Sequence, residues 1–191
     1  MPFVRECILT TLDTGGNVHA APMGIHEYEA HLVILPFKPS ITLDNLESQG
    51  TATLNYTDDV RVYAGCLTGH NDWPTRTTKI IQGERLANCI SHTEVEVIQK
   101  TDDQVRPKYF CKVVHEAIHA PFHGYNRAQF AVIELAILVS RLHMLDIEKI
   151  NHEIDYLKPK IEKTAGPRER EAWNWLMLKV SGFHKSQEGE S

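Results

Sequence analysis

The sequence predicts an α+β protein in which an antiparallel β-barrel is followed by a C-terminal helical region. Three observations favour this fold. Short alternating apolar segments separated by turn residues fill the first 120 residues, the hydrophobic period changes to about 3.6 residues from Asn126 onward, and a turn-forming stretch with Pro121 and Gly124 lies between. We therefore expect a barrel domain over residues 1–124 and a helical subdomain over residues 125–191.

The expected strands begin with residues 7–12, which stop at the pair Gly15 and Gly16, as in a tight hairpin. Residues 18–28 and 31–35 form a second pair, which ends at Pro36 because proline cannot donate to a neighbouring strand. The same alternation predicts strands over residues 51–56, 58–67, 79–86, 93–100 and 108–120. Several short strands joined by regular turns are typical of a closed or nearly closed antiparallel barrel.

A short helix is expected over residues 40–50, since Ser40 or Thr42 can cap its start and Gly50 suits its end. The C-terminal part contains one apolar helical face over residues 126–144 and a second helix that starts at residue 146. Pro159 is expected to kink or end that second helix. A third helix is expected to start at Pro167, because proline is favourable in a first turn.

Composition narrows the function classes. The chain has 191 residues, 42% of them hydrophobic and 24% charged, with a net charge of −5, which suits one globular protein with its own core. The acidic balance and the absence of a Lys/Arg stripe argue against nucleic-acid binding. No apolar run approaches the roughly 20 residues that cross a bilayer, and residues 1–10 do not form a secretory signal, so we expect a cytoplasmic protein without a membrane partner.

The run His115-Glu116-Ala117-Ile118-His119 matches the HExxH pattern of zinc hydrolases. That motif works on a helix, where both imidazoles face one metal ion and the glutamate acts as a general base. Pro121 disfavours such a helix, and the preceding residues are typical of a strand, on which His115 and His119 would be about 13 Å apart. We therefore expect no metal site here, and a zinc-dependent hydrolase at His115, Glu116 and His119 stays a minor alternative.

Two segments suggest a site for an anionic, planar ligand. Residues 18–25 form a strand of small residues with Pro22 and Gly24, which a central strand avoids unless something approaches its backbone. The alternative is an edge strand with a bulge at residues 22–24.

The second segment is the start of the short helix. Free backbone N–H groups, the helix dipole, a cation and hydroxyls combine there into a phosphate site. The alternative is a capped helix with a solvated lysine. The residues concerned are Lys38, Ser40, Thr42 and Asn45.

The strand with Ala21-Pro22-Met23-Gly24, followed by Lys38, Thr42 and Asn45-Leu46 and then by Gly50 and Leu54-Asn55, resembles the FMN-binding split-barrel superfamily. This superfamily includes pyridoxamine-phosphate oxidases and flavin reductases. The whole chain, including the helical segment that starts at Asn126-Arg127-Ala128, resembles the branch of the superfamily found in methanogenic archaea and in methylotrophic bacteria that use tetrahydromethanopterin.

This resemblance implies a split β-barrel and a homodimer with FMN near the subunit interface. It implies that the isoalloxazine is lined by the backbone of Met23, Gly24 and Ile25, and that the ribityl and phosphate groups are held by Lys38, Ser40, Thr42 and Asn45. A second basic residue, such as Arg61 or Arg127, would complete the phosphate site.

The resulting hypothesis is an FMN-binding flavoprotein that resembles oxidoreductases, acts on a small molecule and is linked to C1 or tetrahydromethanopterin metabolism. A non-catalytic flavin carrier or sensor is the alternative. The catalytic residues stay unassigned: the candidates for proton transfer are His26, His70, His115 and His119, because an imidazole titrates near neutral pH.

Overall fold

The computed structural model describes residues 3–189, which form two compact units. The first unit contains the chain up to Thr57 together with Trp73–Phe122, and the second contains Asp58–Asp72 together with the chain from His123 onward. The helical unit therefore includes Asp58–Asp72, a segment that lies between two parts of the barrel in the sequence.

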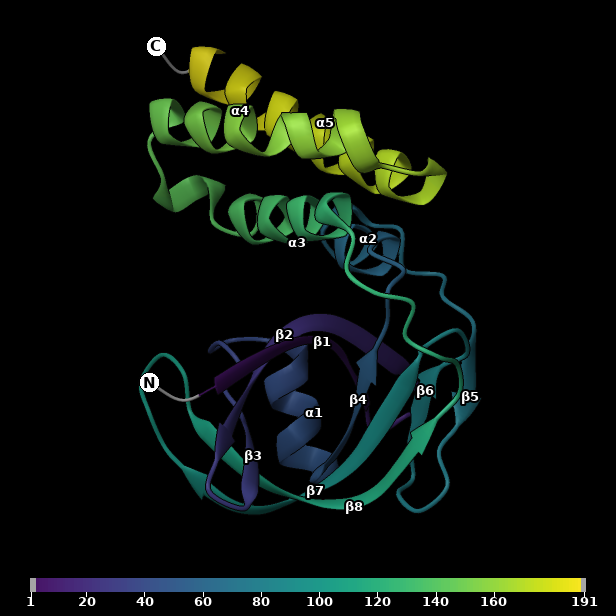
Figure 1. Cartoon of the computed structure of the whole chain (residues 1–191). Coiled ribbons are helices and arrows are strands. Elements are labelled where there is room, and N and C mark those ends of the chain that lie inside the picture. Colours follow the sequence, from purple (N-terminus) through teal and green to yellow (C-terminus); the bar gives the residue numbers. More distant parts are fainter. Residues whose placement is uncertain (1–2, 190–191) are drawn as a thin grey trace. The chain divides into compact units, whose positions relative to one another are not determined.

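The first unit is built around a closed antiparallel barrel of six strands (Figure 1). The strand order is β1-β2-β3-β8-β7-β4, which confirms the predicted α+β fold with an antiparallel barrel and C-terminal helices. The strands are β1 (Phe3–Leu12), β2 (Val18–Tyr28), β3 (His31–Ile34), β4 (Thr51–Tyr56), β7 (Ser91–Thr101) and β8 (Lys108–Ile118).

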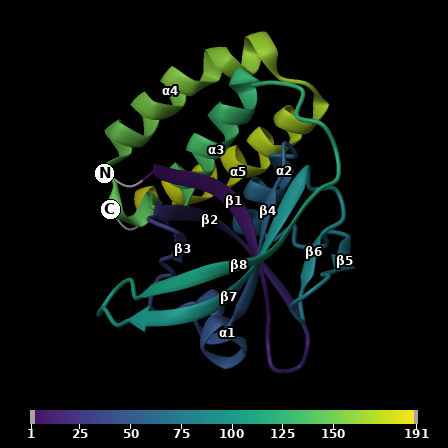
Figure 2. The same cartoon turned by 60° about the horizontal axis from the view of Figure 1, so that its bottom comes forward.

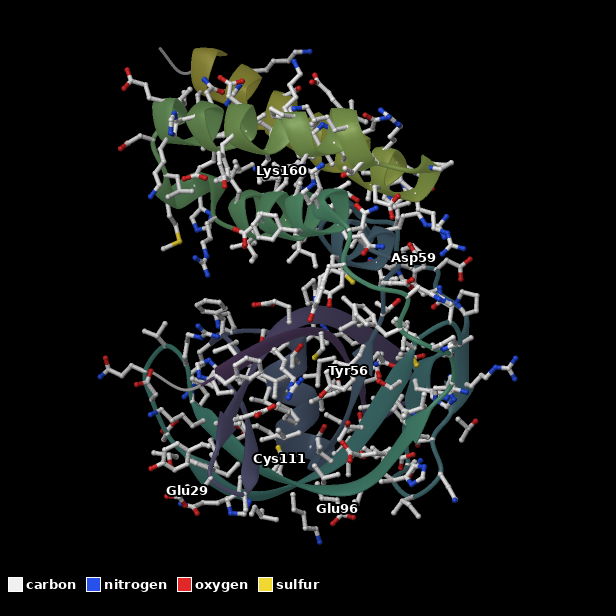
Figure 3. The ribbon with its side chains drawn as sticks, viewed as in Figure 1. Glu29, Tyr56, Asp59, Glu96, Cys111 and Lys160 are labelled. Atoms are coloured by element: carbon white, nitrogen blue, oxygen red, sulfur yellow. The ribbon has the colours of Figure 1, made fainter. Side chains whose placement is uncertain are left out.

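The core of this unit consists of apolar side chains from the strands and from helix α1 (Ile41–Gln49), which lies against the barrel (Figure 2). Leu43 and Leu46 of α1 pack among barrel residues such as Leu54 and Cys111, the latter labelled in Figure 3. The helix begins and ends as predicted: Ser40 accepts a hydrogen bond from the Leu43 N–H, and Gly50 takes the left-handed conformation at φ 67°.

A small hairpin of β5 (Thr75–Thr77) and β6 (Glu84–Leu86) adjoins the barrel. The strand predicted over residues 79–86 is therefore wrong except at its end. Residues 78–83 form a loop instead, because the backbone N–H groups of Lys79, Ile80 and Ile81 bond to the carboxylate of Glu94 rather than to another strand.

The second unit is helical, with α2 (Arg61–Thr68), α3 (Arg127–Val139), a 3₁₀ turn (Leu142–Met144), α4 (Ile147–Thr164) and α5 (Pro167–Gly189). The strand predicted over residues 58–67 is wrong, because α2 buries Val62, Tyr63 and Ala64 and contacts α3 and α5. None of the helices in the described part of the chain has the length and apolarity needed to cross a membrane.

Helix α4 does not end at Pro159 but continues to Thr164. Leu157 and Ile161, on either side of the proline, are both buried, as are Ile150 and Ile154. Burial of this apolar seam stabilises the helix across the position where the proline removes one backbone hydrogen bond.

Candidate functional site

One edge of strand β2 is paired along almost its whole length, and the other edge is paired only at its end. The strand pairs with β1 from Val18 to Glu27, whereas β3 pairs only with His26–Tyr28. Within residues 3–189, no strand pairs with the other edge of residues 18–25. Alternate peptide groups of a strand point to each edge, so this edge presents backbone donors and acceptors to a ligand. Proline is found in edge strands, which explains how β2 accommodates Pro22.

Gly24 lies near the end of this edge and has a steric reason to be glycine. A Cβ atom there would lie 3.0 Å from Val4 Cγ1 and 3.3 Å from Glu6 Oε1. The register runs without interruption through Cys7↔Met23 and Glu6↔Gly24, so the bulge considered for residues 22–24 is not formed. Met23 is partly buried against the core, whereas Ile25 is fully buried in it, so Ile25 can reach a ligand only through its backbone.

The start of α1 carries the other predicted ligand residues, but most of them have partners within the chain. The Ser40 hydroxyl is used as the helix cap, and Lys38 Nζ lies 3.1 Å from Asp102 Oδ1. Thr42 and Asn45 are buried, and Asn45 Nδ2 donates to Thr11 Oγ1 at 2.9 Å. Lys38 and Ser40 are the two members of this group that reach the surface.

The two arginines considered for the phosphate lie in the helical unit. Arg61 makes a bidentate ion pair with Asp59, at 2.8 Å from Nε to Oδ1 and 2.6 Å from Nη2 to Oδ2, and a further contact with Glu171. Arg127 is the exposed first residue of α3. Arg61 is thus already neutralised, whereas Arg127 presents its charge to solvent.

An open pocket of about 730 Å³ adjoins the far end of the β2 edge, within the usual volume range of small-molecule sites. Tyr28 and Phe110 meet edge to face in it with their ring centroids 6.3 Å apart. Glu29, at the turn between β2 and β3, is labelled in Figure 3. The lining residues are His26, Glu27, Tyr28, Glu29, Val33, Leu35, Lys108 and Phe110.

A second group of polar side chains lies where β7 pairs with β8. Residues 115–118 belong to strand β8, as expected, so the HExxH run does not form the helix that a zinc hydrolase needs. Glu94 is paired with His115, and His92 is paired with Ala117, midway between His115 and His119. The His92 ring therefore contacts both other imidazoles, with centroid distances of 5.7 Å to His115 and 5.0 Å to His119.

The carboxylate of Glu94 is the buried centre of this group. It accepts hydrogen bonds from the N–H groups of Lys79 at 2.7 Å, Ile80 at 2.7 Å and Ile81 at 3.0 Å, and it lies 3.2 Å from His92 Nε2. Burial alone would raise the pKa of Glu94, but these hydrogen bonds outweigh burial and lower the pKa to about 2. Glu94 is therefore a carboxylate at neutral pH.

His119 continues the chain of contacts to the surface, since its Nε2 lies 2.8 Å from His92 Nδ1. Desolvation, followed by the positive charge of Arg85 and the nearby His92 and His115, lowers the pKa of His119. Neither His92 nor Glu94 was among the predicted site residues. Their spacing does place His92 and Glu94 on one face of a strand, as it does His115 and His119, but it does not indicate that these two strands pair.

Two family models match the chain. The model for the N-terminal domain of a protein of unknown function, DUF447, covers residues 5–120, and the corresponding C-terminal DUF447 model covers residues 126–178. The barrel with C-terminal helices has the fold of a solved DUF447 protein, which confirms the predicted split-barrel fold. This chain belongs to the DUF447 family.

Solved structures share this fold at low sequence identity. An FMN-bound DUF447 protein of Methanosarcina mazei is 17% identical, with a TM-score of 0.80 over 94% of this chain and 96% of that chain. An FMN-binding protein of Thermus thermophilus with bound 1-cyclohex-2-enone is 12% identical, with a TM-score of 0.52 over 62% of this chain and 71% of that chain.

Flavoredoxin of Desulfovibrio vulgaris is 8% identical, with a TM-score of 0.52 over 61% of this chain and 70% of that chain. The likeness to the M. mazei protein includes the helical part, whereas the other two matches cover about three fifths of this chain. No curated protein sequence matches this chain significantly.

Proposed function

We propose that this chain binds FMN along the β2 edge and acts as an oxidoreductase-like flavoprotein on a small organic substrate. The observation that carries the proposal is the half-buried edge of residues 18–25, which presents peptide groups without a strand partner. The FMN-bound state of the similar M. mazei structure supports the same cofactor.

The isoalloxazine ring suits this edge because its rim carries both hydrogen-bond donors and acceptors. Those peptide groups of Met23, Gly24 and Ile25 that point to this edge would bind that rim, and the missing side chain of Gly24 would let the ring approach the backbone. Bound FMN supplies the redox chemistry, while the chain binds and orients it and controls access of the substrate.

We assign the phosphate to the start of α1, where the helix dipole favours an anion. The Lys38–Asp102 pair is exposed and is worth about 0–1 kcal/mol, so Lys38 can exchange Asp102 for a phosphate at little cost. Ser40 lies beside it. Thr42 and Asn45 are buried, so we propose that they position the site instead of contacting the phosphate as predicted. The Asn45–Thr11 hydrogen bond, for example, fixes α1 against β1. Arg127 stays the proposed second basic residue of the phosphate site. In a homodimer, the other subunit would contribute it.

The substrate would enter the pocket that begins at His26, directly after the proposed ring-binding residues. Its aromatic walls, Tyr28 and Phe110, favour an apolar or planar molecule, and Lys108 offers a positive charge. The family resemblance makes a pterin-related or C1-pathway compound a specific candidate. His26 lies within this pocket and is the imidazole proposed for proton transfer there.

The first experiment measures FMN binding in solution. Purified chain mixed with FMN and desalted should keep flavin absorption at about one FMN per chain. Lys38→Ala should weaken FMN binding about 10-fold or more while leaving the affinity for riboflavin, which lacks the phosphate, unchanged. Lys112→Ala is the matched control, because Lys112 pairs with Glu96 on the surface. The proposal would be overturned by loss of all FMN from the unchanged chain on desalting. The phosphate assignment would be overturned if Lys38→Ala weakened the binding of FMN and of riboflavin equally.

A second experiment separates an oxidoreductase from a carrier. The flavin-loaded chain is mixed with NADH or NADPH in the absence of air, and the bleaching of flavin absorption is followed with and without candidate electron acceptors. Repeated turnover supports an enzyme. Tight FMN binding without reduction by either donor would favour a flavin carrier or sensor.

A further inference from the structure

The carboxylate and imidazole group between β7 and β8 has no part in the flavin site described above. One ligand atom from each of His92, Glu94 and His115 lies within 4.8 Å of the other two. We propose that these three residues form a binding site for a first-row divalent cation of the Zn²⁺ type, with His119 as the outer partner that orients His92.

The donor set and spacing suit such an ion. Zn²⁺ prefers imidazole nitrogen and carboxylate oxygen at about 2.0–2.2 Å in a tetrahedral arrangement, which places neighbouring ligand atoms about 3.3 Å apart. The distance from His92 Nε2 to Glu94 Oε1 is 3.2 Å. Two of the three ligand atoms therefore already have the separation of a tetrahedral edge.

Glu94 keeps one acceptor position for the ion. A carboxylate offers about four lone-pair sites. Oε2 accepts from Ile80 and Ile81, whereas Oε1 accepts from Lys79 and faces His92 Nε2. The three amide bonds fix the carboxylate and leave the position of Oε1 that faces the imidazole for the cation.

His92 has the outer partner that ligating histidines usually have. With the cation on Nε2, the proton resides on Nδ1 and is donated to His119 Nε2, 2.8 Å away. The two rings are stacked, with 13° between their planes. This bond selects the tautomer in which His92 Nε2 is the ligand atom.

His115 completes the set from strand β8. Its ring meets His92 edge to face and is half-buried, so rotation of its side chain can bring a nitrogen to the cation. Three protein ligands leave the fourth tetrahedral position to water. The site differs from the HExxH reading, since Glu116 bonds to Thr93 Oγ1 and the ligands come from two strands.

The experiment measures metal binding by the full, tag-free chain after chelator treatment and without flavin, so that its result is independent of the flavin proposal. Co²⁺ is added as the spectroscopic probe, and Zn²⁺ is then titrated in competition. One Co²⁺ per chain with tetrahedral visible absorption bands, displaced by one equivalent of Zn²⁺, is the expected result.

Variants assign the ligands. His115→Gln changes a half-buried side chain, and His92→Gln changes a buried one; each should weaken Zn²⁺ binding more than about 100-fold, because loss of even an outer partner costs about 10–100-fold. His119→Gln should weaken it within that smaller range. His123→Gln is the matched control, since His123 is exposed and outside the group, and it should bind like the unchanged chain.

The result that would overturn the proposal is a chain whose Zn²⁺ and Co²⁺ binding equals that of the folded His115→Gln variant. The group would then be a hydrogen-bonded network that ties residues 79–81 to β7. Octahedral rather than tetrahedral Co²⁺ bands, unaffected by His115→Gln, would contradict it equally, because they would place the ion elsewhere. Circular dichroism of each variant confirms that it is folded.

Discussion

The hydroxyl of Tyr109 donates a hydrogen bond to Glu47 Oε1 at 2.8 Å and thereby joins strand β8 to helix α1. Tyr109 is 2% exposed, and Lys100 pairs with the same carboxylate from β7. Burial, followed by the hydrogen bond to Glu47 and its negative charge, raises the pKa of Tyr109 to about 12. This bond therefore adds to the contacts that hold α1, whose start is the proposed phosphate site, against the barrel.

Tyr109→Phe should lower the free energy of unfolding by about 1.5–3 kcal/mol at neutral pH, because one hydrogen bond to a charged acceptor is lost. The folded chain holds the Tyr109 proton more tightly than the unfolded chain, so this contribution is full below about pH 10 and is lost as the pH rises toward 12. Urea unfolding at several pH values checks this. In the variant, stability should fall less steeply between pH 10 and 12.

Tyr156→Phe is the control for this prediction, because Tyr156 is 62% exposed. It should leave both the neutral stability and the alkaline slope unchanged. Glu47 also raises the pKa of Lys100, so part of the alkaline slope stays in Tyr109→Phe. An unchanged alkaline slope in Tyr109→Phe would show that Tyr109 titrates alike in the folded and unfolded chain.

Glu94→Gln should destabilise the barrel unit by about 3 kcal/mol, because an amide cannot accept hydrogen bonds from all three loop N–H groups and leaves buried groups unpaired. The amide protons of Lys79, Ile80 and Ile81 should exchange with solvent about 10-fold faster or more in the metal-free chain. Hydrogen exchange and urea unfolding measure both effects. Exchange that is unchanged at these three amides would contradict the role given to Glu94.

Glu96→Gln provides the comparison for Glu94→Gln. Glu96 lies two residues further along β7 and pairs with Lys112 at 2.8 Å, with 40% of its side chain exposed. Surface pairs of this kind contribute about 0–1 kcal/mol. The control should therefore change neither the exchange at residues 79–81 nor the stability by more than that amount.

Much of the barrel could be predicted because its strands alternate in polarity and end at turn residues. The hairpin at Gly15 and Gly16 and the cap at Ser40 depend on local chemistry, which neighbouring residues in the sequence reveal. Residues 61–68 could not be assigned in this way, because their apolar run is buried by α3 and α5, which are distant in the sequence. The strand predicted over residues 79–86 was wrong for the same reason, since the backbone of loop 78–83 bonds to Glu94, which is distant from it in the sequence.

In the candidate sites too, features set by neighbouring residues could be predicted, whereas features set by contacts between distant residues could not. The sequence indicates the bare backbone at Gly24, because small residues in a strand are themselves informative. It could place His115 and His119 on one face but not find their neighbour His92, because that pairing depends on the register between β7 and β8. The register shifts between Glu94 and Val95. A shift of one residue moves a side chain to the other face, so this convergence emerges only from the folded sheet.

Gly24→Ala tests the bare backbone directly. The added Cβ would lie 3.0 Å from Val4 Cγ1, so we expect FMN affinity to fall about 10-fold or more as the edge becomes crowded and shifts. FMN fluorescence quenching measures the affinity. Gly182→Ala in α5 is the matched control, since its Cβ would meet nothing within 4 Å, and it should bind FMN normally. Unchanged affinity in Gly24→Ala would move the ring away from this part of β2.

The ion pair of Asp59 and Arg61 should contribute to the stability of the helical unit. Asp59, labelled in Figure 3, is 1% exposed, and Arg61→Met would leave its carboxylate buried without the bidentate partner. Loss of one member of a buried pair costs about 3–5 kcal/mol, whereas Arg76→Met in the exposed part of β5 should cost little. Urea unfolding of both variants checks the difference.

The double variant Asp59→Asn/Arg61→Met distinguishes the pair from the two side chains taken singly. Asp59→Asn removes the buried negative charge that has lost its guanidinium in Arg61→Met, so the double variant should be more stable than Arg61→Met alone. Equal stability of the two would mean that the packing of the Arg61 stem, rather than its charge, stabilises the start of α2. The sequence predicted a strand over residues 58–67 and did not indicate this pair. Two oppositely charged residues at this spacing are common on protein surfaces, and their burial follows only from the packing of α2 against α3 and α5.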